Sequence, residues 1–189
     1  MRRFLATILT IAVLCLTAAA PAFCQDLLRR EVFGAIGIGK TYDDEGSLGS
    51  GLNAGGGLGY RLSQRFALEA EVNGFRTRRD FSSSFAPFQA NGAHVMGSGL
   101  LYLSRGRAQA YLLLGAGLLH VHVKNGFGEL PAGQSGNGFA INFGGGLRIF
   151  MRPHFSLRPE LRIYSGGAGG AVEPPFSDIR LSLGVGYHW

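Results

Sequence analysis

Residues 139–164 read FAINFGGGLRIFMRPHFSLRPELRIY, and this stretch decides the fold. Two runs of alternating apolar and polar or very small residues flank a short break at 151–154. A period of two is typical of β-strands, because successive side chains point to opposite faces of a sheet. Each run has about ten residues, which is longer than most strands of soluble sandwiches and matches the strands of transmembrane barrels. The stretch therefore predicts two such strands joined by a tight turn.

The same alternation recurs along the chain. The ending at 179–189 has an apolar residue at every second position, and 66–75 alternates apolar residues with small or polar ones. The segment 108–121 is apolar on both faces, so alternation does not fix which face points outward. The residues that we assign to its outer face are Tyr111, Leu113, Leu119 and Val121. The expected strands are 32–40, 52–62, 66–75, 92–102, 108–121, 139–149, 155–164 and 179–189.

The connections between these segments alternate in length. Short ones lie at 63–65, 103–107 and 151–154, and longer polar ones at 41–51, 76–91, 122–138 and 165–176. This order predicts an all-β fold, an eight-stranded antiparallel meander that closes into a transmembrane β-barrel with both chain ends on one side. The short turns are expected to face the periplasm.

Residues 1–24 are expected to be a secretory signal peptide. Two arginines precede an apolar run at 4–16, and small residues follow up to Ala22. This order is typical of a cleaved signal, and the run is shorter than the roughly 20 residues that span a bilayer as a helix. Cleavage after Ala22 or after Cys24 fits the small-residue rule and leaves one barrel domain at 25–189.

Composition narrows the class of protein further. The chain has 31 Gly among 189 residues, and each Gly inside a helix costs about 1 kcal/mol relative to Ala, so a helical domain is disfavoured. Loss of the signal peptide removes two Arg and no acid, which lowers the formal net charge from +6 to +4. This weak, dispersed charge does not indicate nucleic-acid binding. Both Cys lie within 1–24, so no structural disulfide is expected.

Three segments carry a resemblance to a known family: GGGLRIFMRPHFSLRPELRIY at 144–164, AYLLLGAGL at 110–118 and LSLGVGYHW at 181–189. Together they resemble the small outer membrane beta-barrel domain family, which is similar to the transmembrane domain of outer membrane protein A. The resemblance implies an outer-membrane location and recognition of the ending by the barrel assembly machinery. The residues implicated in that recognition are Leu181, Leu183, Val185, Tyr187 and Trp189.

Charged side chains fall on the inward faces of several expected strands. Ionised groups inside so narrow a barrel need partners, because an unpaired buried charge costs several kcal/mol. We therefore expect a salt-bridged network that plugs the lumen, with a narrow ion or small-solute channel as the alternative. The seven residues expected to form it are Glu69, Glu71, Arg148, Arg158, Glu160, Arg162 and Arg180. Pro159 lacks an amide donor, so a bulge or local irregularity is expected beside Arg158.

Motifs that suggest other chemistry are weak. Residues 34–41 read GAIGIGKT and match the phosphate-binding loop pattern, but no helix is expected after them. His94 and Ser98 share a strand face about 14 Å apart, too far for a direct hydrogen bond. His120 and His122, which we assign to the lumen, lack a third metal ligand. No catalytic, cofactor or metal site is expected, and a lipid A modifying enzyme is the remaining alternative.

The long connections are the other candidates for function. The one at 76–91 mixes basic, acidic and aromatic residues that could contact anionic lipid headgroups or a partner. They are Arg76, Arg78, Arg79, Asp80, Phe81, Phe85, Pro87 and Phe88. We expect a monomeric, non-enzymatic outer membrane protein with a structural or surface-interaction role. Its expected partners are outer-membrane lipids, lipopolysaccharide and the barrel assembly machinery, with a surface partner possible through the long loops.

Overall fold

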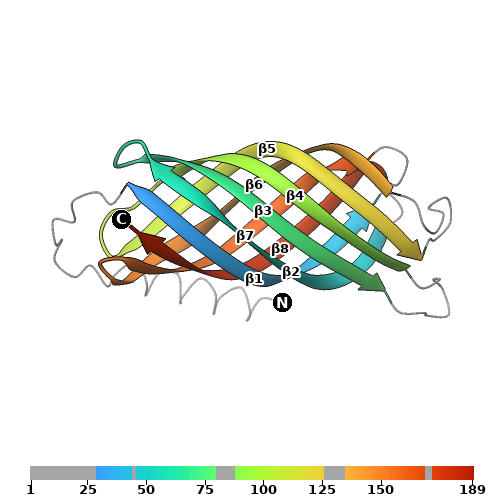
Figure 1. Cartoon of the computed structure of the whole chain (residues 1–189), viewed down its shortest axis with the longest axis horizontal. Helices are drawn as coiled ribbons and strands as arrows, with labels where there is room; N and C mark the ends of the chain where they lie inside the picture. The colour runs from blue at the N-terminus through green and yellow to red at the C-terminus, as the bar shows by residue number, and fades with distance from the viewer. Residues whose placement is uncertain (1–28, 44–45, 80–87, 126–134, 169–171) are drawn as a thin grey trace, which may run out of the picture.

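The computed structural model describes residues 29–43, 46–79, 88–125, 135–168 and 172–189. They form eight antiparallel strands in chain order, and the first strand pairs with the last to close a barrel (Figure 1). The strands are β1 (Arg30–Asp43), β2 (Gly46–Arg61), β3 (Phe66–Arg79), β4 (Phe88–Tyr102), β5 (Ala108–Asn125), β6 (Ser135–Arg152), β7 (Phe155–Ala168) and β8 (Val172–His188). The predicted all-β class and eight-stranded meander are confirmed. The expected signal peptide, 1–24, lies outside the described residues.

The two ends of the barrel differ in what they carry. One end, called here the turn end, holds both termini of the barrel and the connections at 62–65, 103–107 and 153–154. At the other end, called here the loop end, β1, β3, β5 and β7 end and β2, β4, β6 and β8 begin. At the turn end the amides of Arg30 and Trp189 donate to each other's carbonyls at 3.1 and 3.0 Å, which closes the seam between β1 and β8. No helix among the described residues is long and apolar enough to cross a membrane.

Every strand extends beyond its predicted bounds, and mostly toward the loop end. β5 and β6 have 18 residues each, against roughly 9–11 for a strand that just spans a bilayer. The added residues are mostly polar ones and Gly, which carry no apolar alternation to mark a strand. The predicted bounds of the four long loops are therefore wrong, since parts of 41–51, 76–91, 122–138 and 165–176 are strand.

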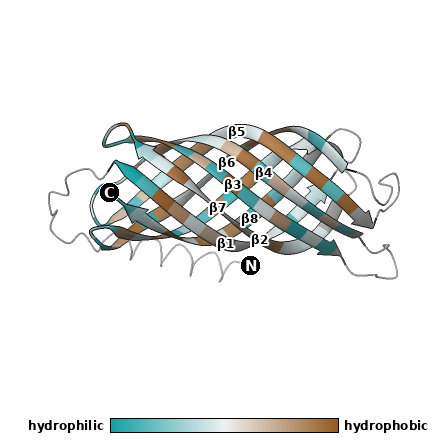
Figure 2. Cartoon of the chain, in the orientation of Figure 1, coloured by the Kyte–Doolittle hydropathy of each residue, from teal (hydrophilic) through white to brown (hydrophobic). Residues whose placement is uncertain are grey.

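The outer surface of the barrel carries an apolar belt. Large apolar side chains stand exposed on it, such as Ile36 at 70%, Leu52 at 71% and Leu114 at 68%. Figure 2 shows brown, hydrophobic segments distributed along the strands of the barrel. Exposed apolar surface on this scale is unfavourable in water and suits the hydrocarbon of a membrane. The apolar faces of 66–75, 139–149, 155–164 and 179–189 point outward and form part of this belt.

The predicted phase of β5 is wrong. Leu112, Leu114 and Leu118 point outward, with 52 to 68% of each exposed. The four residues assigned to the outer face are at most 4% exposed inside the barrel: Tyr111, Leu113, Leu119 and Val121. His120 and His122 consequently point outward and not into the lumen. The reason is that β5 contributes apolar side chains to the lumen as well as to the belt. Because both of its faces are apolar, the sequence pattern does not show which face points outward.

Pro159 interrupts the sheet without a bulge. The ladder between β6 and β7 pairs Gly146 with Glu160 and resumes at Ile149 with Leu157, in the same register. Two pairs are missing between them, whereas β7 pairs continuously with β8 past Pro159. The missing amide donor therefore falls on the β6 side. The sequence predicted a bulge or a local irregularity beside Arg158, and the structure shows a local irregularity there, a gap of two pairs in the ladder.

Candidate functional site: the charged lumen

A compact cluster of ion pairs fills the middle of the lumen. Arg158 lies 2.8 Å from Glu69 and 3.2 Å from Glu160, and Arg162 lies 2.5 Å from Glu69. Arg162 also pairs with Glu71 and Glu160. Alternation places these residues on the inner faces of β3 and β7, which lie across the barrel from each other. Each carboxylate has a cation within reach, so the cost of removing the charges from water is offset by pairing.

The cluster continues toward the turn end. Glu31 on β1 pairs with Arg148 on β6 and lies 3.6 Å from Arg158. The hydroxyl of Tyr111 on β5 donates a hydrogen bond of 2.5 Å to Glu160. These contacts join β1, β3, β5, β6 and β7 in one network across the lumen.

A second charged group lies toward the loop end. Arg180 on β8 pairs with Asp178 at 2.5 Å and donates a hydrogen bond to Asn73 on β3. Its guanidinium lies 4.5 Å from the centre of the Tyr164 ring and 4.7 Å from that of Phe75. Among the described residues no ion pair joins this group to the central cluster. Arg180 is therefore held by one carboxylate, the amide oxygen of Asn73 and two aromatic rings.

An aromatic layer closes the lumen beside Arg180. The ring of His94 stacks on Tyr164 at 4.5 Å between centres and 5° between planes, and on Phe75 at 5.1 Å. His94 is fully buried, and neither ring nitrogen has a hydrogen-bond partner among the described residues. The apolar side chains that pack with this layer are Ala90, Met96, Leu119, Val121, Val123 and Ala140. The loop half of the lumen is thus filled by rings and hydrocarbon, and the middle by charge.

Glycines on the inner wall make room for these large side chains. A Cβ atom at Gly146 would lie 2.7 Å from the hydroxyl oxygen of Tyr111 and 2.7 Å from the carbonyl oxygen of Pro159. A Cβ atom at Gly186 would lie 2.9 Å from Ser156 Oγ. Real side-chain atoms do not approach so closely, so these two positions require glycine while the lumen is filled as observed.

One serine and one histidine in the lumen lie within hydrogen-bond distance, a contact that the sequence did not suggest. Ser156 Oγ lies 2.8 Å from His188 Nε2, and Glu31 Oε1 lies 3.6 Å from the same nitrogen. In a catalytic triad the acid contacts Nδ1, the nitrogen that faces away from the serine. Ser156 is also only 1% exposed. The contact therefore lacks both the orientation and the substrate access that acyl transfer requires.

The serine and histidine that the sequence placed on one strand face, Ser98 and His94, contact different partners. Ser98 shares a 3.3 Å hydrogen bond with Asn142 on β6, whereas His94 lies between two rings. On the outer surface His120 Nδ1 lies 2.7 Å from Asn137 Oδ1, and His122 Nδ1 lies 2.7 Å from a serine hydroxyl. No group of three metal-ligating side chains occurs within the described ranges.

The seven residues proposed for the lumen network are all buried inside the barrel. Six of them lie in the central cluster, and Arg180 lies apart from it. Sequence reasoning missed Glu31, Asp178 and His188, which are also buried inside. Glu31 and Asp178 each precede an expected strand by one residue, so the predicted strand starts excluded them. His188 lies on the polar face of the expected strand 179–189, and its alternation was sufficient to find it.

The remaining sequence candidates lie outside the lumen. The five residues of the expected assembly signal point outward from β8 and the chain end: Leu181, Leu183, Val185, Tyr187 and Trp189. Arg76, Arg78 and Arg79 belong to β3 and Phe88 to β4, so their assignment to a loop is wrong. Asp80, Phe81, Phe85 and Pro87 lie outside the described residues. Residues 34–41 lie within β1, with no helix after them among the described residues.

Comparison with solved structures finds the same architecture in proteins of known structure. Neisserial surface protein A (NspA) has 15% sequence identity and a TM-score of 0.70, and the match covers 85% of this chain and 97% of that one. Ail of Yersinia pestis, in complex with the heparin analogue sucrose octasulfate, has 16% identity, a TM-score of 0.53, and coverage of 85% and 99%. The N-terminal β-barrel domain of Pseudomonas aeruginosa OprF has 18% identity, a TM-score of 0.51, and coverage of 85% and 98%. At these identities the likeness shows the fold alone.

Comparison of sequences gives the family. No curated protein matches the chain. The family model for the outer membrane protein beta-barrel domain matches residues 8–188. This match confirms the predicted resemblance and the outer-membrane location, and it agrees with the apolar belt and the closed ladder of strands. The chain belongs to the outer membrane protein beta-barrel domain family.

Proposed function

We propose that this protein is a closed, non-enzymatic barrel with a structural or surface-interaction role in the outer membrane, and not a channel. The observation that carries this proposal is the continuous filling of the lumen. The ion pairs around Arg158 and Arg162 occupy the middle, and the stacked ring of His94 occupies the loop half. An ion or solute that crossed would have to part both layers.

Physical chemistry favours the closed state. Separating one of these ion pairs is unfavourable, because a buried charge that loses its partner costs about 3 to 5 kcal/mol. Opening a path would expose several such groups at once, since Arg162 alone serves Glu69, Glu71 and Glu160. Water entering the lumen would lower this cost, so conductance is the direct test of whether the centre is dry.

The absence of enzymatic activity is part of the proposal. The buried serine and histidine contact, Ser156 with His188, has its acid on the wrong ring nitrogen for a triad. A lipid A modifying enzyme would also need its reactive group near the lipid face. We expect lipid A incubated with the purified protein to keep its mass, whereas loss of an acyl chain would contradict this part of the proposal.

We further propose that the protein acts as a monomer that contacts outer-membrane lipids and lipopolysaccharide. A closed barrel has every described strand paired on both sides, so it offers no free sheet edge to a second copy. We propose that the barrel assembly machinery reads the alternating apolar residues of β8 together with Trp189. Support for this comes from their exposure on the outer face beside the closing seam.

Conductance of purified protein in planar bilayers tests the proposed function. The folded state is first verified by migration on a gel, because a barrel that resists detergent until it is boiled changes its apparent size on heating. We expect no steady, porin-sized conductance, with a wide-lumen porin in the same bilayers as the positive control. Reproducible open channels in the unmodified protein would replace the closed barrel with a transport function.

A further inference from the structure

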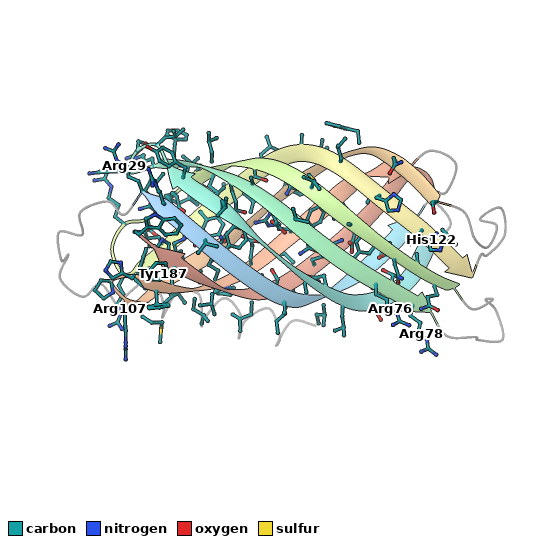
Figure 3. The ribbon with its side chains drawn as sticks, in the orientation of Figure 1. Arg29, Arg76, Arg78, Arg107, His122 and Tyr187 are labelled. Atoms are coloured by element: carbon teal, nitrogen blue, oxygen red, sulfur yellow. The ribbon has the colours of Figure 1, made fainter. Side chains whose placement is uncertain are left out.

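Two histidines stand on the outer face of β5 just past the apolar belt. On three neighbouring strands the belt ends in one register row of exposed side chains, which are Val95, Leu118 and Phe139. His120 and His122 occupy the next two outward-facing rows toward the loop end. Figure 3 shows His122 at the end of the barrel opposite to that of Arg29. Both imidazoles therefore lie where the outer surface changes from apolar to polar and where dissolved ions have access.

A hydrogen bond to β6 orients each imidazole. His120 Nδ1 lies 2.7 Å from Asn137 Oδ1, and His122 Nδ1 lies 2.7 Å from Ser135 Oγ. An amide oxygen only accepts, so Nδ1 of His120 carries the proton and Nε2 of the neutral ring keeps a free lone pair. The serine hydroxyl can also accept, which permits the same form at His122. Proteins orient metal-binding imidazoles in this way, with the second ring nitrogen donating to an oxygen.

The spacing of the two histidines suits a single ion. They lie two residues apart on one strand face, so their backbones are about 7 Å apart. Transition metals bind imidazole nitrogen at about 2.0–2.1 Å, so an ion shared by two Nε2 atoms in tetrahedral geometry needs them about 3.4 Å apart. Each ring has to lean about 2 Å toward the other to close this difference in the strand spacing. Rotation about the two side-chain torsions of a histidine is sufficient for that.

A neutral oxygen is available on the β4 side. Asn91 pairs in register with His122, and its Oδ1 is buried without a hydrogen-bond partner among the described residues. Cβ atoms in such a pair lie about 5 Å apart, which brings the amide within reach of an ion on His122. His120 pairs with Ala93, whose small side chain leaves room for bound water. The described residues provide no third His, Cys, Asp or Glu here, so the other ligands are neutral oxygens.

The described cation across β4 is engaged elsewhere. Arg76 on β3 pairs in register with Asn91. With the amide oxygen of Gln89 facing the guanidinium, Arg76 donates to it at 3.1 Å from Nε and at 2.7 Å from a terminal nitrogen. Gln89 is two residues from Asn91 toward the loop end, about 7 Å along the strand. The guanidinium is thereby directed away from the two histidines.

We propose that the Nε2 atoms of His120 and His122 bind one divalent transition-metal ion at the outer surface, with Asn91 and water completing its coordination. Imidazole nitrogens with neutral oxygens suit copper and zinc, and the general order of affinities puts Cu²⁺ above Zn²⁺. Ca²⁺ and Mg²⁺ take sets of oxygen ligands and are not bound here. The site goes beyond the structural role proposed above, and its existence does not depend on whether the lumen conducts.

Titration of the folded, tag-free protein in detergent with Cu²⁺ tests this inference, followed by calorimetry and electron paramagnetic resonance. His120→Gln and His122→Gln each remove one imidazole and keep a polar side chain. The matched control, His154→Gln, removes an exposed imidazole at the turn end. Two linked ligands bind about 100-fold or more tightly than one, so each test variant should lose about 100-fold in affinity and the control less than about threefold. The resonance spectrum should show two bound nitrogens in the unmodified protein and one in each test variant.

Asn137 is a positioning residue in this proposal, and two variants test that role. Asn137→Leu removes the acceptor for His120 Nδ1 and should weaken Cu²⁺ binding about 10-fold, as the loss of such a hydrogen bond does at other metal sites. Asn137→Asp keeps an acceptor and should bind Cu²⁺ at least as tightly as the unmodified protein. Equal weakening in the two variants would overturn the assigned ring form and the inference with it.

Three other results would also overturn the metal site. They are an unchanged Cu²⁺ affinity in either histidine variant, a single bound nitrogen in the unmodified protein, and an equal loss of affinity in His154→Gln. Competition separates the classes of ion, since Zn²⁺ in excess should displace Cu²⁺ and Ca²⁺ in the same excess should not. Displacement by Ca²⁺ would contradict binding through imidazole. Conductance of the same samples tests the closed lumen separately, so failure of either proposal leaves the other standing.

Discussion

Arginine side chains lie both in the lumen and on the outer surface of the barrel, and their surroundings differ in the two regions. Inside, Arg162 contacts three carboxylates and is almost fully buried. Outside, Arg105 at the turn end is exposed. A guanidinium is therefore part of the packed interior in one region and exposed at the surface in the other. The role of a charged residue in this barrel therefore depends on whether its side chain points into the lumen or outward. Successive residues of a strand point to opposite faces, so a shift of one residue exchanges the two environments.

Removal of Arg162 should show the largest effect. The change Arg162→Met keeps much of the volume but leaves Glu71 without its one described ion-pair partner. We expect a loss of about 3 to 5 kcal/mol in the free energy of unfolding, measured by urea titration in detergent. Arg105→Met, at an exposed turn, should change it by less than about 0.5 kcal/mol. Adding Glu71→Gln to Arg162→Met should recover part of the loss, and failure to recover any would show that the two side chains do not interact.

A cation placed in the apolar belt should show the next largest effect. Leu114 lies in the belt on β5, and Leu114→Arg is expected to cost about 2 to 4 kcal/mol, as an arginine near the bilayer midplane does. Leu103→Arg, at the turn end where exposed arginines already occur, should cost about 0 to 1 kcal/mol. The same titration in lipid vesicles measures both. Equal costs would mean that the belt and the turn end face the same solvent.

A methyl group added to the inner wall should have a smaller effect. Gly146→Ala puts a Cβ atom 2.7 Å from the Tyr111 hydroxyl and from the backbone of Pro159, so we expect a loss of about 1 to 3 kcal/mol. Gly97→Ala on the outer face is the matched control, because the nearest atom to its added Cβ lies 3.9 Å away. A neutral Gly146→Ala would show that the lumen is looser than its contacts indicate.

The chain end should show its effect in the amount of protein assembled. Trp189 stacks on Tyr187 at 5.9 Å and closes the seam with Arg30. Deletion of Trp189 is expected to lower outer-membrane levels more than a change at Asp44, judged by immunoblots of fractionated membranes. Similar levels in the two variants would make the ending an ordinary strand terminus. Purified protein that refolds equally well in both cases would locate the defect in assembly rather than in stability.

The parts of the fold that could be predicted are those where the two faces differ in polarity. The strands from Phe139 to Tyr164 alternate apolar with polar or tiny residues, and their strand type and outward face followed directly. β5 could not be assigned because Leu119 and Val121 fill the loop half of the lumen while Leu114 and Leu118 face lipid. Hydrophobicity alone does not distinguish a dry lumen from a membrane.

The sequence predicted the charged lumen residues that lie within the predicted strand bounds, and it missed those that lie outside these bounds. Arg158 and Glu160 alternate with apolar residues, so their inward orientation was evident. Glu31 was missed because its strand begins before the apolar pattern does, and Arg76 was placed in a loop because its strand continues past the belt. Which carboxylate meets which cation depends on how strands β1, β3, β6 and β7 face one another across the lumen. That information is carried by closure of the barrel and not by any one segment.

The contacts of Glu31 have a consequence for the order of events during assembly. Glu31 and Arg148 are 117 residues apart in the chain, and Glu69 and Arg158 are 89 apart. Until the first and last strands meet, the future inner wall is an open charged surface that neither lipid nor an unfinished sheet can neutralise. A partly formed barrel of this sequence is therefore unstable within the bilayer, because its charged inner wall is exposed to hydrocarbon. Insertion and closure must therefore proceed together, and neutralisation of the inner wall marks the moment at which the newly made protein becomes committed to the membrane.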